Sequence, residues 1–412
     1  MGDIVIRLRN VLGMCKLEST EGVDPTPAAG LDAFPFEIDS LSIGSPFTTE
    51  QSGEATGTMI AGAPLVLGQA VPVGIRCRMK GAGAGVVYSA SVKPPAHALL
   101  ASCGWVGLFT DAVAATALSA GTTTSATLAS PFAATAQLYR GMPLLLGGTG
   151  FPGARPLITN YTSGRVATLA DIFGSALSVS ATAEIKPNWT YAMTSPVSDA
   201  ERTAQQPSAA LYFNEDGINY KLLGFRGKLA MGAQTARPGY FDIQGMAIWG
   251  GQADVDMPTG AVVASHAAPM LNMQSGISPA FAIDRKLLPI SNFNYDPATQ
   301  VDSYEDPNTI NGFGAAQIGG REPALTCDPL KTRLSVRNHL AALEANGGPF
   351  VGAARAGQVS GNRWTLALPQ LLPQAVEMAT RGNARSENLT YRAMSAGRDN
   401  AGRDGDAILC FD

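Results

Sequence analysis

Charged residues are scarce in this sequence. Asp, Glu, Lys and Arg make up 15% of the 412 residues, and the formal net charge is −4. The sequence therefore lacks the basic stripe that clamps nucleic-acid phosphates, and a weakly acidic wall repels a DNA backbone. A surface with so little charge is more typical of a subunit that is covered by its partners than of a monomer exposed to water.

Residues that form disulfides or hold metals are also few. The five cysteines are odd in number and scattered, and none forms a Cys-x-x-Cys pair. We therefore expect no disulfide framework and no zinc site, and we interpret the cysteines as small buried residues in a reducing environment. They are Cys15, Cys77, Cys103, Cys327 and Cys410.

The three histidines, His97, His266 and His339, lie far apart in the sequence. No Gly-x-Ser-x-Gly elbow and no His-Glu-x-x-His pair surrounds a candidate catalytic residue. We interpret all three histidines as solvated or capping residues. A hydrolase of unrecognised type remains an alternative that no constellation of residues supports, so the sequence predicts that the protein is not an enzyme.

The carboxylates do not form a recognisable metal site. Asp302 to Asp306 reads as an acidic solvated loop, and Asp404 and Asp406 fall in a polar, turn-like stretch. Neither group has the Asp-x-Asp spacing and later Glu of a calcium loop. We therefore expect no metal and no cofactor.

Long apolar runs are missing as well. No stretch approaches the ~20 uninterrupted apolar residues of a membrane span. The first residues, Met1 to Ile4, have no basic region followed by an apolar core, so we expect no signal peptide and no contact with a membrane.

Short apolar runs separated by turn residues dominate the chain, which contains 46 Gly and 27 Pro. This pattern favours a mainly β protein of sandwiches or barrels with a few short helices. Asp216-Gly217 between two strand-like runs predicts a hairpin, and strands are expected around 227–234 and 240–249. A helix is expected at 96–103, with Pro94-Pro95 before it and Gly104 after it.

The second half of the chain repeats the order of elements of the first. Residues 62–81 resemble 314–332 in rhythm and in a late cysteine, and the helix at 96–103 corresponds to 339–346. The strands at 220–249 correspond to 363–368, 377–378 and 389–394. This order predicts a tandem duplication. The alternative is that short β-hairpin sequences resemble one another by chance.

A segment rich in Thr, Ser and Ala interrupts the first copy. We interpret residues 117–193 as a small inserted β-domain, because it falls between a helix and a hairpin that the second copy joins directly. The predicted organisation is therefore a first unit at 1–116 and 194–255, the insertion, and a second unit at 256–412.

Three motifs resemble the tail tube proteins of long-tailed bacteriophages. The first is the turn Gly22-Val23-Asp24-Pro25-Thr26-Pro27, and the second is the helix end at 99–105. The third is the hairpin at 211–217 that continues through 224–227 to Pro238-Gly239. They occur in the family's order and cover roughly 1–110 and 209–250, whereas the insertion departs from the family's pattern.

The resemblance implies a structural virion protein. Such proteins fold as a β-sandwich with a flanking helix and assemble into stacked rings, through which DNA leaves the head without specific binding. Two units in one chain imply a trimer with pseudo-sixfold symmetry rather than a hexamer. The implied partners are further copies of the chain and the tail terminator, tape measure and distal tail proteins. The implied location is the virion tail, assembled in the cytoplasm of the host bacterium.

The resemblance also singles out one loop. Pro46, Phe47, Thr48, Thr49, Glu50 and Gln51 form the candidate contact with an adjacent ring, because the stretch is polar, flanked by glycine and carries one aromatic residue. An ordinary surface loop is the alternative.

Two other functions stay open at the level of the sequence. A distal tail or baseplate ring protein of the same fold would differ in copy number. A carbohydrate-binding β-sandwich adhesin would need exposed aromatic platforms, and the chain has only four tryptophans, three of them in expected core elements.

Overall fold

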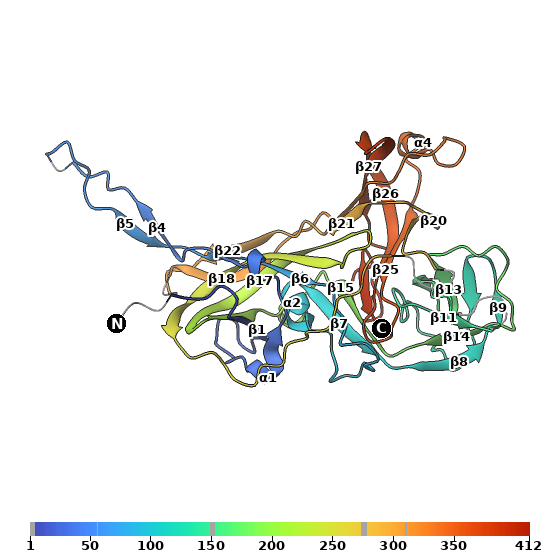
Figure 1. The fold of residues 1–412 in the computed structure, drawn as a ribbon, viewed down its shortest axis with the longest axis horizontal. Coiled ribbons are helices and arrows are strands. Elements are labelled where there is room, and N and C mark those ends of the chain that lie inside the picture. The colour runs from blue at the N-terminus through green and yellow to red at the C-terminus, as the bar shows by residue number, and fades with distance from the viewer. Residues whose placement is uncertain (1–4, 56, 149–152, 273–277, 310) are drawn as a thin grey trace.

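The computed structural model describes residues 5–55, 57–148, 153–272, 278–309 and 311–412. Met1 to Ile4, where no signal peptide was expected, lie outside these ranges. Within them the chain is mainly β, as the sequence predicted, and no sheet closes into a barrel. Two repeated units and an inserted lobe share the molecule (Figure 1).

The first unit is built from both flanks of the insertion. Its elements are β1 (Val11–Leu17), α1 (Ala29–Asp32), β2 (Ala33–Phe34), a 3₁₀ turn (Ile38–Ser40), β3 (Ser42–Ile43), β4 (Phe47–Glu50), β5 (Leu65–Gly68), β6 (Val71–Arg78), α2 (His97–Ser102), β7 (Trp105–Thr110), β15 (Asn188–Met193), α3 (Asp199–Gln205), β16 (Ala209–Glu215), β17 (Ile218–Gln234) and β18 (Tyr240–Asp254). The hairpin predicted at Asp216-Gly217 joins β16 to β17, and both residues have the positive φ that such a tight turn needs.

The second unit follows without interruption. Its elements are β19 (Phe281–Ile283), β20 (Lys286–Leu287), β21 (Asn292–Asp296), β22 (Val301–Glu305), β23 (Phe313–Ile318), β24 (Ala324–Cys327), α4 (His339–Glu344), β25 (Phe350–Ala356), β26 (Trp364–Arg381), β27 (Ala384–Ala393) and β28 (Ile408–Phe411). The predicted helices at 96–103 and 339–346 are both present as α2 and α4.

Seven strand pairings of the first unit recur in the second. In the first unit they are β1–β2, β1–β16, β3–β6, β4–β5, β6–β18, β16–β17 and β17–β18. In the second unit they are β19–β20, β19–β25, β21–β24, β22–β23, β24–β27, β25–β26 and β26–β27. Because all fourteen pairings are antiparallel and occur in the same chain order, the two units have the same topology.

The pairing registers also agree. Cys77 of β6 pairs with Phe241, and Cys327 of β24 pairs with Leu389. Gly68 precedes Cys77 by the same number of positions as Ile318 precedes Cys327. The pair Phe47–Gly68 in the first unit therefore matches the pair Val301–Ile318 in the second. Residue equivalences between the units therefore follow from hydrogen-bonded partners, without reliance on sequence identity.

The two units share one sheet. Residues 231–234 of β17 pair with residues 292–295 of β21, which gives the row β3-β6-β18-β17-β21-β24-β27-β26. Alternate side chains on one face of this row, such as Ile75, Phe241, Phe293 and Leu325, enter a single apolar core that runs beneath both units. Helix α2, predicted at 96–103, adds Leu99 and Leu100 to this core.

The insertion has an apolar core of its own. Its strands are β8 (Val113–Ala117), β9 (Ala120–Gly121), β10 (Ser125–Thr127), β11 (Leu145–Gly147), β12 (Ile158–Tyr161), β13 (Val166–Leu169) and β14 (Thr182–Ile185), in two small sheets. That core spans Leu118 to Ile185 and forms the lobe at one end of Figure 1. A buried ion pair between Asp171 and Arg355 joins the lobe to the second unit.

One strand inside the predicted insertion belongs to the large sheet. The sequence assigned 117–193 to the insertion, but β15 pairs with β7 on one side and β28 on the other. All six residues of β15 are buried, because the strand lies between the units rather than on the lobe. The insertion therefore departs after β7 and returns before β15.

Candidate assembly surfaces

The junction between the units shows what covers a sheet edge in this protein. At residues 231–232, β17 has β18 on one edge and β21 on the other, and the pairing with β21 continues to residue 234. Ala233 pairs with Phe293, and both side chains are 1% exposed. The second unit thus completes the sheet of the first and buries the contact.

The equivalent edge of the second unit has no such cover among the described residues. Beyond residue 371, β26 pairs only with β27, since its pairings with β25 and β28 lie at 364–371. By register Met378 corresponds to Ala233, yet its side chain is 76% exposed. At the far end of the row, β3 pairs only with β6 among the described strands. Unpaired edges of this kind are templates for further strands.

The face of the shared sheet that points away from the core is polar. Its charged side chains are largely paired with one another: Arg76 with Asp242 at 2.7 Å, Arg78 with Glu37 at 3.0 Å, Arg392 with Glu322 at 3.3 Å and Arg381 with Asp328 at 3.4 Å. Exposed ion pairs of this kind contribute little to stability. Their effect is to leave the face hydrophilic and nearly neutral.

Strands β4 and β5 form an arm that projects from the body (Figure 1). The candidate loop residues Pro46 to Gln51 lie at its base, and Phe47 to Glu50 form strand β4 rather than a loop. The sequence interpretation missed this strand because every β4 side chain is exposed, which removes the apolar alternation that identifies strands. The β-branched and aromatic residues at 47–49 were the remaining signal.

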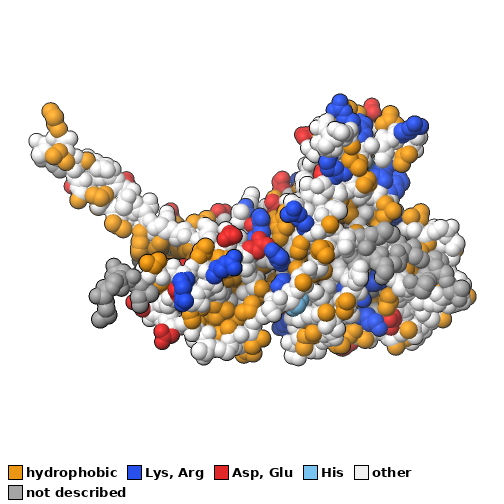
Figure 2. All heavy atoms as spheres, in the orientation of Figure 1, with side chains coloured by type: hydrophobic (Ala, Val, Ile, Leu, Met, Phe, Trp, Pro, Cys, Tyr) orange, Lys and Arg blue, Asp and Glu red, His pale blue; other side chains and the backbone are white. Residues whose placement is uncertain are grey.

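Apolar side chains on the arm face solvent. Leu65 is 57% exposed and Val66 is 68% exposed, and hydrophobic side chains are visible along the arm in Figure 2. A run of exposed apolar residues on a projecting hairpin is characteristic of a surface that another protein covers.

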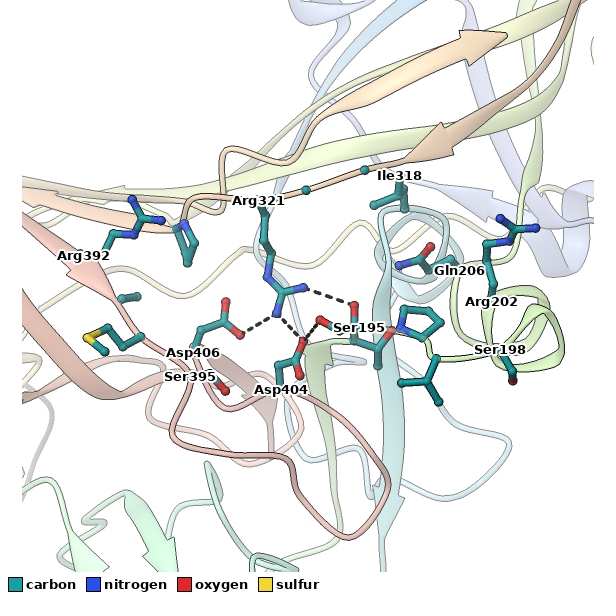
Figure 3. A pocket seen from close by; sticks show the side chains of 18 of the residues that line it. Ser195, Ser198, Arg202, Gln206, Ile318, Arg321, Arg392, Ser395, Asp404 and Asp406 are labelled. Carbon is teal, nitrogen blue, oxygen red and sulfur yellow. Dashed lines mark hydrogen bonds and ion pairs between the residues drawn. The ribbon is translucent and has the colours of Figure 1, made fainter.

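A cavity of about 890 Å³ lies between the two units (Figure 3). Its wall combines residues after β15, the linker from β23 to β24 and the end of β27. The Arg321 guanidinium crosses this wall and donates to Asp404 at 2.6 Å and to Asp406 at 3.2 Å. Ser195 also donates to Asp404, at 2.7 Å. The cluster fastens the C-terminal segment to the second unit.

The two carboxylates of this cluster affect the pKa values of Arg321 and Tyr295. Burial disfavours the Arg321 cation, but Asp406 and Asp404 outweigh that effect and raise the pKa of Arg321. Tyr295 donates to Asp406 at 3.0 Å, and burial, together with that carboxylate, raises the pKa of the tyrosine well above its usual value. Every charged group of the cluster thus has a partner, which suits a structural clamp. The sequence interpretation of Asp404 and Asp406 as turn-like missed their burial, because Arg321 is more than 80 positions away.

The sequence interpreted the histidines as solvated or capping residues, and none of the three is fully exposed to solvent. All three are half-buried, and each contacts a distant segment. His97 Nδ1 lies 2.8 Å from the Tyr191 hydroxyl. His266 Nε2 lies 3.1 Å from the Gly81 carbonyl, and His339 Nδ1 lies 2.7 Å from Glu387. His97 and His266 line the same cavity beside β1 and α2, whereas His339 lies at the start of α4 in the second unit.

The remaining candidate residues fall in structural roles. Residues 302–306 were expected as an acidic solvated loop, but 302–305 belong to strand β22, which pairs with β23. All five cysteines are free and buried, as predicted. Within the described ranges, no group of three or more His, Cys, Asp and Glu side chains is arranged to hold a metal ion. No helix among the described residues has the length and apolar character needed to cross a membrane.

Comparisons with known proteins add no relative. No family model matches the sequence, and a search of curated proteins finds no match.

Proposed function

We propose that this chain is a structural subunit that assembles head to tail into closed rings, and that stacked rings form the tail tube of a bacteriophage, the conduit for DNA ejection. One observation carries the proposal. The junction between β17 and β21 joins two equivalent units inside the chain. The row of strands ends at the two equivalent places, which are β26 beyond residue 371 and, by register, the region of residues 38–41 that leads into β3.

Repetition of the junction between chains gives a closed assembly. When β26 of one chain pairs with the β3 region of the next, every unit has the same neighbours. Such a heterologous contact either closes into a ring or continues as a helix. The tail-tube resemblance favours rings of six units, which corresponds to three chains with two units each.

The polar face of the shared sheet would line the lumen of such a ring. Its charges occur mostly as ion pairs, and the chain is weakly acidic overall. A surface with these properties does not retain a polyanion. Double-stranded DNA would therefore pass through without specific binding.

The adhesin alternative has little support. Trp105 and Trp364 are 0% exposed and Trp189 is 7% exposed, so three of the four tryptophans offer no platform for a sugar. A distal tail or baseplate ring protein would use the same edges, and its low copy number in the virion would distinguish it.

Solution mass tests the proposal directly. We expect the purified chain to give the mass of a three-chain ring or a multiple of it in light scattering. Met378→Asp places a charge where the internal junction buries Ala233, so we expect it to remain a monomer. Val179→Asp is the matched control, because Val179 is 59% exposed on the inserted lobe. Equal assembly by all three proteins would contradict the proposal.

A further inference from the structure

The two units carry equivalent hairpins with opposite surroundings. Thr49 pairs with Val66 in the β4–β5 arm, and Ser303 pairs with Ala316 in the β22–β23 hairpin. Ala316 is 0% exposed, whereas Val66 is 68% exposed. The same position in the repeat is therefore covered in one unit and open in the other.

The cover on β23 comes from the first unit. The Arg226 guanidinium of β17 donates to the Ala316 carbonyl at 2.6 Å and is itself buried. Ala315 lies so close to Gly224 that a Cβ on that glycine would meet the Ala315 Cβ at 2.7 Å. The β22–β23 hairpin thus leaves its own unit and packs across the β17–β18 hairpin of its neighbour.

The corresponding position on the second unit can be located by register. Gly245 pairs with Val73, four residues before Cys77, and Ala393 donates to the carbonyl of Pro323, four residues before Cys327. Gly245 and Ala393 are therefore equivalent.

The same register gives two further pairs of equivalent residues. Arg226 pairs with Met246, and Met394 donates to the Gln370 carbonyl. Met246 thus corresponds to Met394, and Arg226 corresponds to Gln370. Gln370 is half-buried on β26.

A cavity occupies this position in each unit. In the first unit, Gln244, Gly245 and Met246 face the base of the β22–β23 hairpin, residues 299–302, across a cavity. In the second unit, the equivalent residues Arg392, Ala393 and Met394 line the cavity of Figure 3. By hairpin register, residues 299–302 correspond to 45–48, the base of the β4–β5 arm.

We propose that the cavity of Figure 3 receives residues 45–48 from a second copy of the chain, and that the arm continues along β26 of that copy so that Val66 lies beside Gln370. This inference rests on the proposed head-to-tail ring, whose internal junction it extends. It assigns the arm a partner within the ring, whereas the sequence placed the candidate residues Pro46 to Gln51 against an adjacent ring.

The position of the arm agrees with this assignment. The tip of the β22–β23 hairpin reaches the base of the β4–β5 arm, since a Cβ on Gly68 would collide with the Asn311 carbonyl oxygen. The arm then continues outward beyond the first unit (Figure 1). Repetition of this contact around a ring would place every arm on the neighbouring unit, with the tip of each arm at the base of the next.

Cross-linking tests the contact without perturbing the fold. The double variant Val66→Cys/Gln370→Cys, treated with a short bis-maleimide, is expected to give covalent dimers and trimers on a denaturing gel. The native cysteines are all buried, so the wild-type chain treated in the same way gives the background level of cross-linking. Val66→Cys/Val179→Cys is the control for random collision, and we expect at least a tenfold lower yield from it.

A charged variant separates the inference from the proposed function. We expect Val66→Asp to raise the concentration needed for ring formation at least tenfold, with the monomer still folded by circular dichroism. Rings that form normally, without the 66–370 cross-link, would overturn the arm contact and leave the ring proposal intact. Normal rings that fail to stack would instead assign the arm to the adjacent ring. A wild-type chain that stays monomeric at every concentration would contradict the proposed function itself.

Discussion

The hairpins β4–β5 and β22–β23 occupy the same position in two units of the same topology, yet β4–β5 is exposed along both strands, whereas the middle of β23 is buried. The difference arises from the neighbour rather than from the hairpin, because β22–β23 has the first unit to lie upon. The sheet edges differ in the same way, since the edge of β17 is covered by β21 and the equivalent part of β26 is open. The chain therefore forms this contact between units once. The equivalent surfaces that stay open, the β4–β5 arm and the open part of β26, could form it only with another molecule.

Breaking the covered edge should have the largest effect on the isolated chain. Phe293→Ala removes a buried ring opposite Ala233, and we expect the free energy of unfolding to fall by ~3–5 kcal/mol. Met378→Ala at the equivalent open edge should change it by less than about 0.5 kcal/mol. Denaturant unfolding of monomers at low concentration measures both. Equal losses would mean that the two edges do not differ in the way described.

Removing the clamp beside the Figure 3 cavity should be next in size. Arg321→Ala leaves Asp406 buried without its cation and Asp404 with only Arg398, at 3.7 Å, and we expect a loss of roughly 3 kcal/mol. Arg321→Lys keeps the charge and should lose less. Unchanged stability in the alanine variant would show that the cluster does not hold the C-terminal segment in place.

The first residues of α2 and α4 offer a finer comparison. His97 packs beside Trp189 and Tyr191, whereas His339 contacts the carboxylate of Glu387. Burial, aided by Lys93, lowers the pKa of His97 to about 4, from the usual value of about 6.5. Between these two values the unfolded chain binds a proton that the folded chain does not.

The free energy of unfolding should therefore fall as the pH drops through this window. The expected loss is roughly 2–3 kcal/mol, and the contribution is complete above about pH 6.5. His97→Gln should remove this part of the pH dependence, and Lys93→Gln should narrow the window. Denaturation curves at several pH values give the slope. An identical slope in wild type and His97→Gln would contradict the assignment.

Local features of the fold could be predicted from the sequence. The Asp216-Gly217 turn and the helix between Pro94-Pro95 and Gly104 depend on residues close together in the chain, and the repeat was found by comparing the order of such local elements in the two halves. The alternation of apolar residues in β6 is another local signal, typical of a half-buried strand. These signals act within about ten positions, so one sequence is enough to read them.

The assembly surfaces could not be predicted in the same way. Leu65, Val66 and Leu67 form the same apolar run in a covered strand and in an exposed one. The sequence alone therefore does not distinguish a buried strand from an exposed contact surface. The junction of β17 with β21 joins segments about 60 positions apart, and the contact of Arg321 with Asp404 spans more than 80. Such pairings leave no local pattern. The one surface that the sequence did select, Pro46 to Gln51, was found through its resemblance and not through its exposure.

End-on electron microscopy of the purified protein is the most direct test of head-to-tail assembly. Negatively stained class averages should show rings with a central hole, sixfold in their inner wall and threefold at the rim, where one inserted lobe per chain projects. Compact single molecules at every concentration and ionic strength would contradict the account, because the open edge of β26 and the exposed arm would then have no partner in another copy.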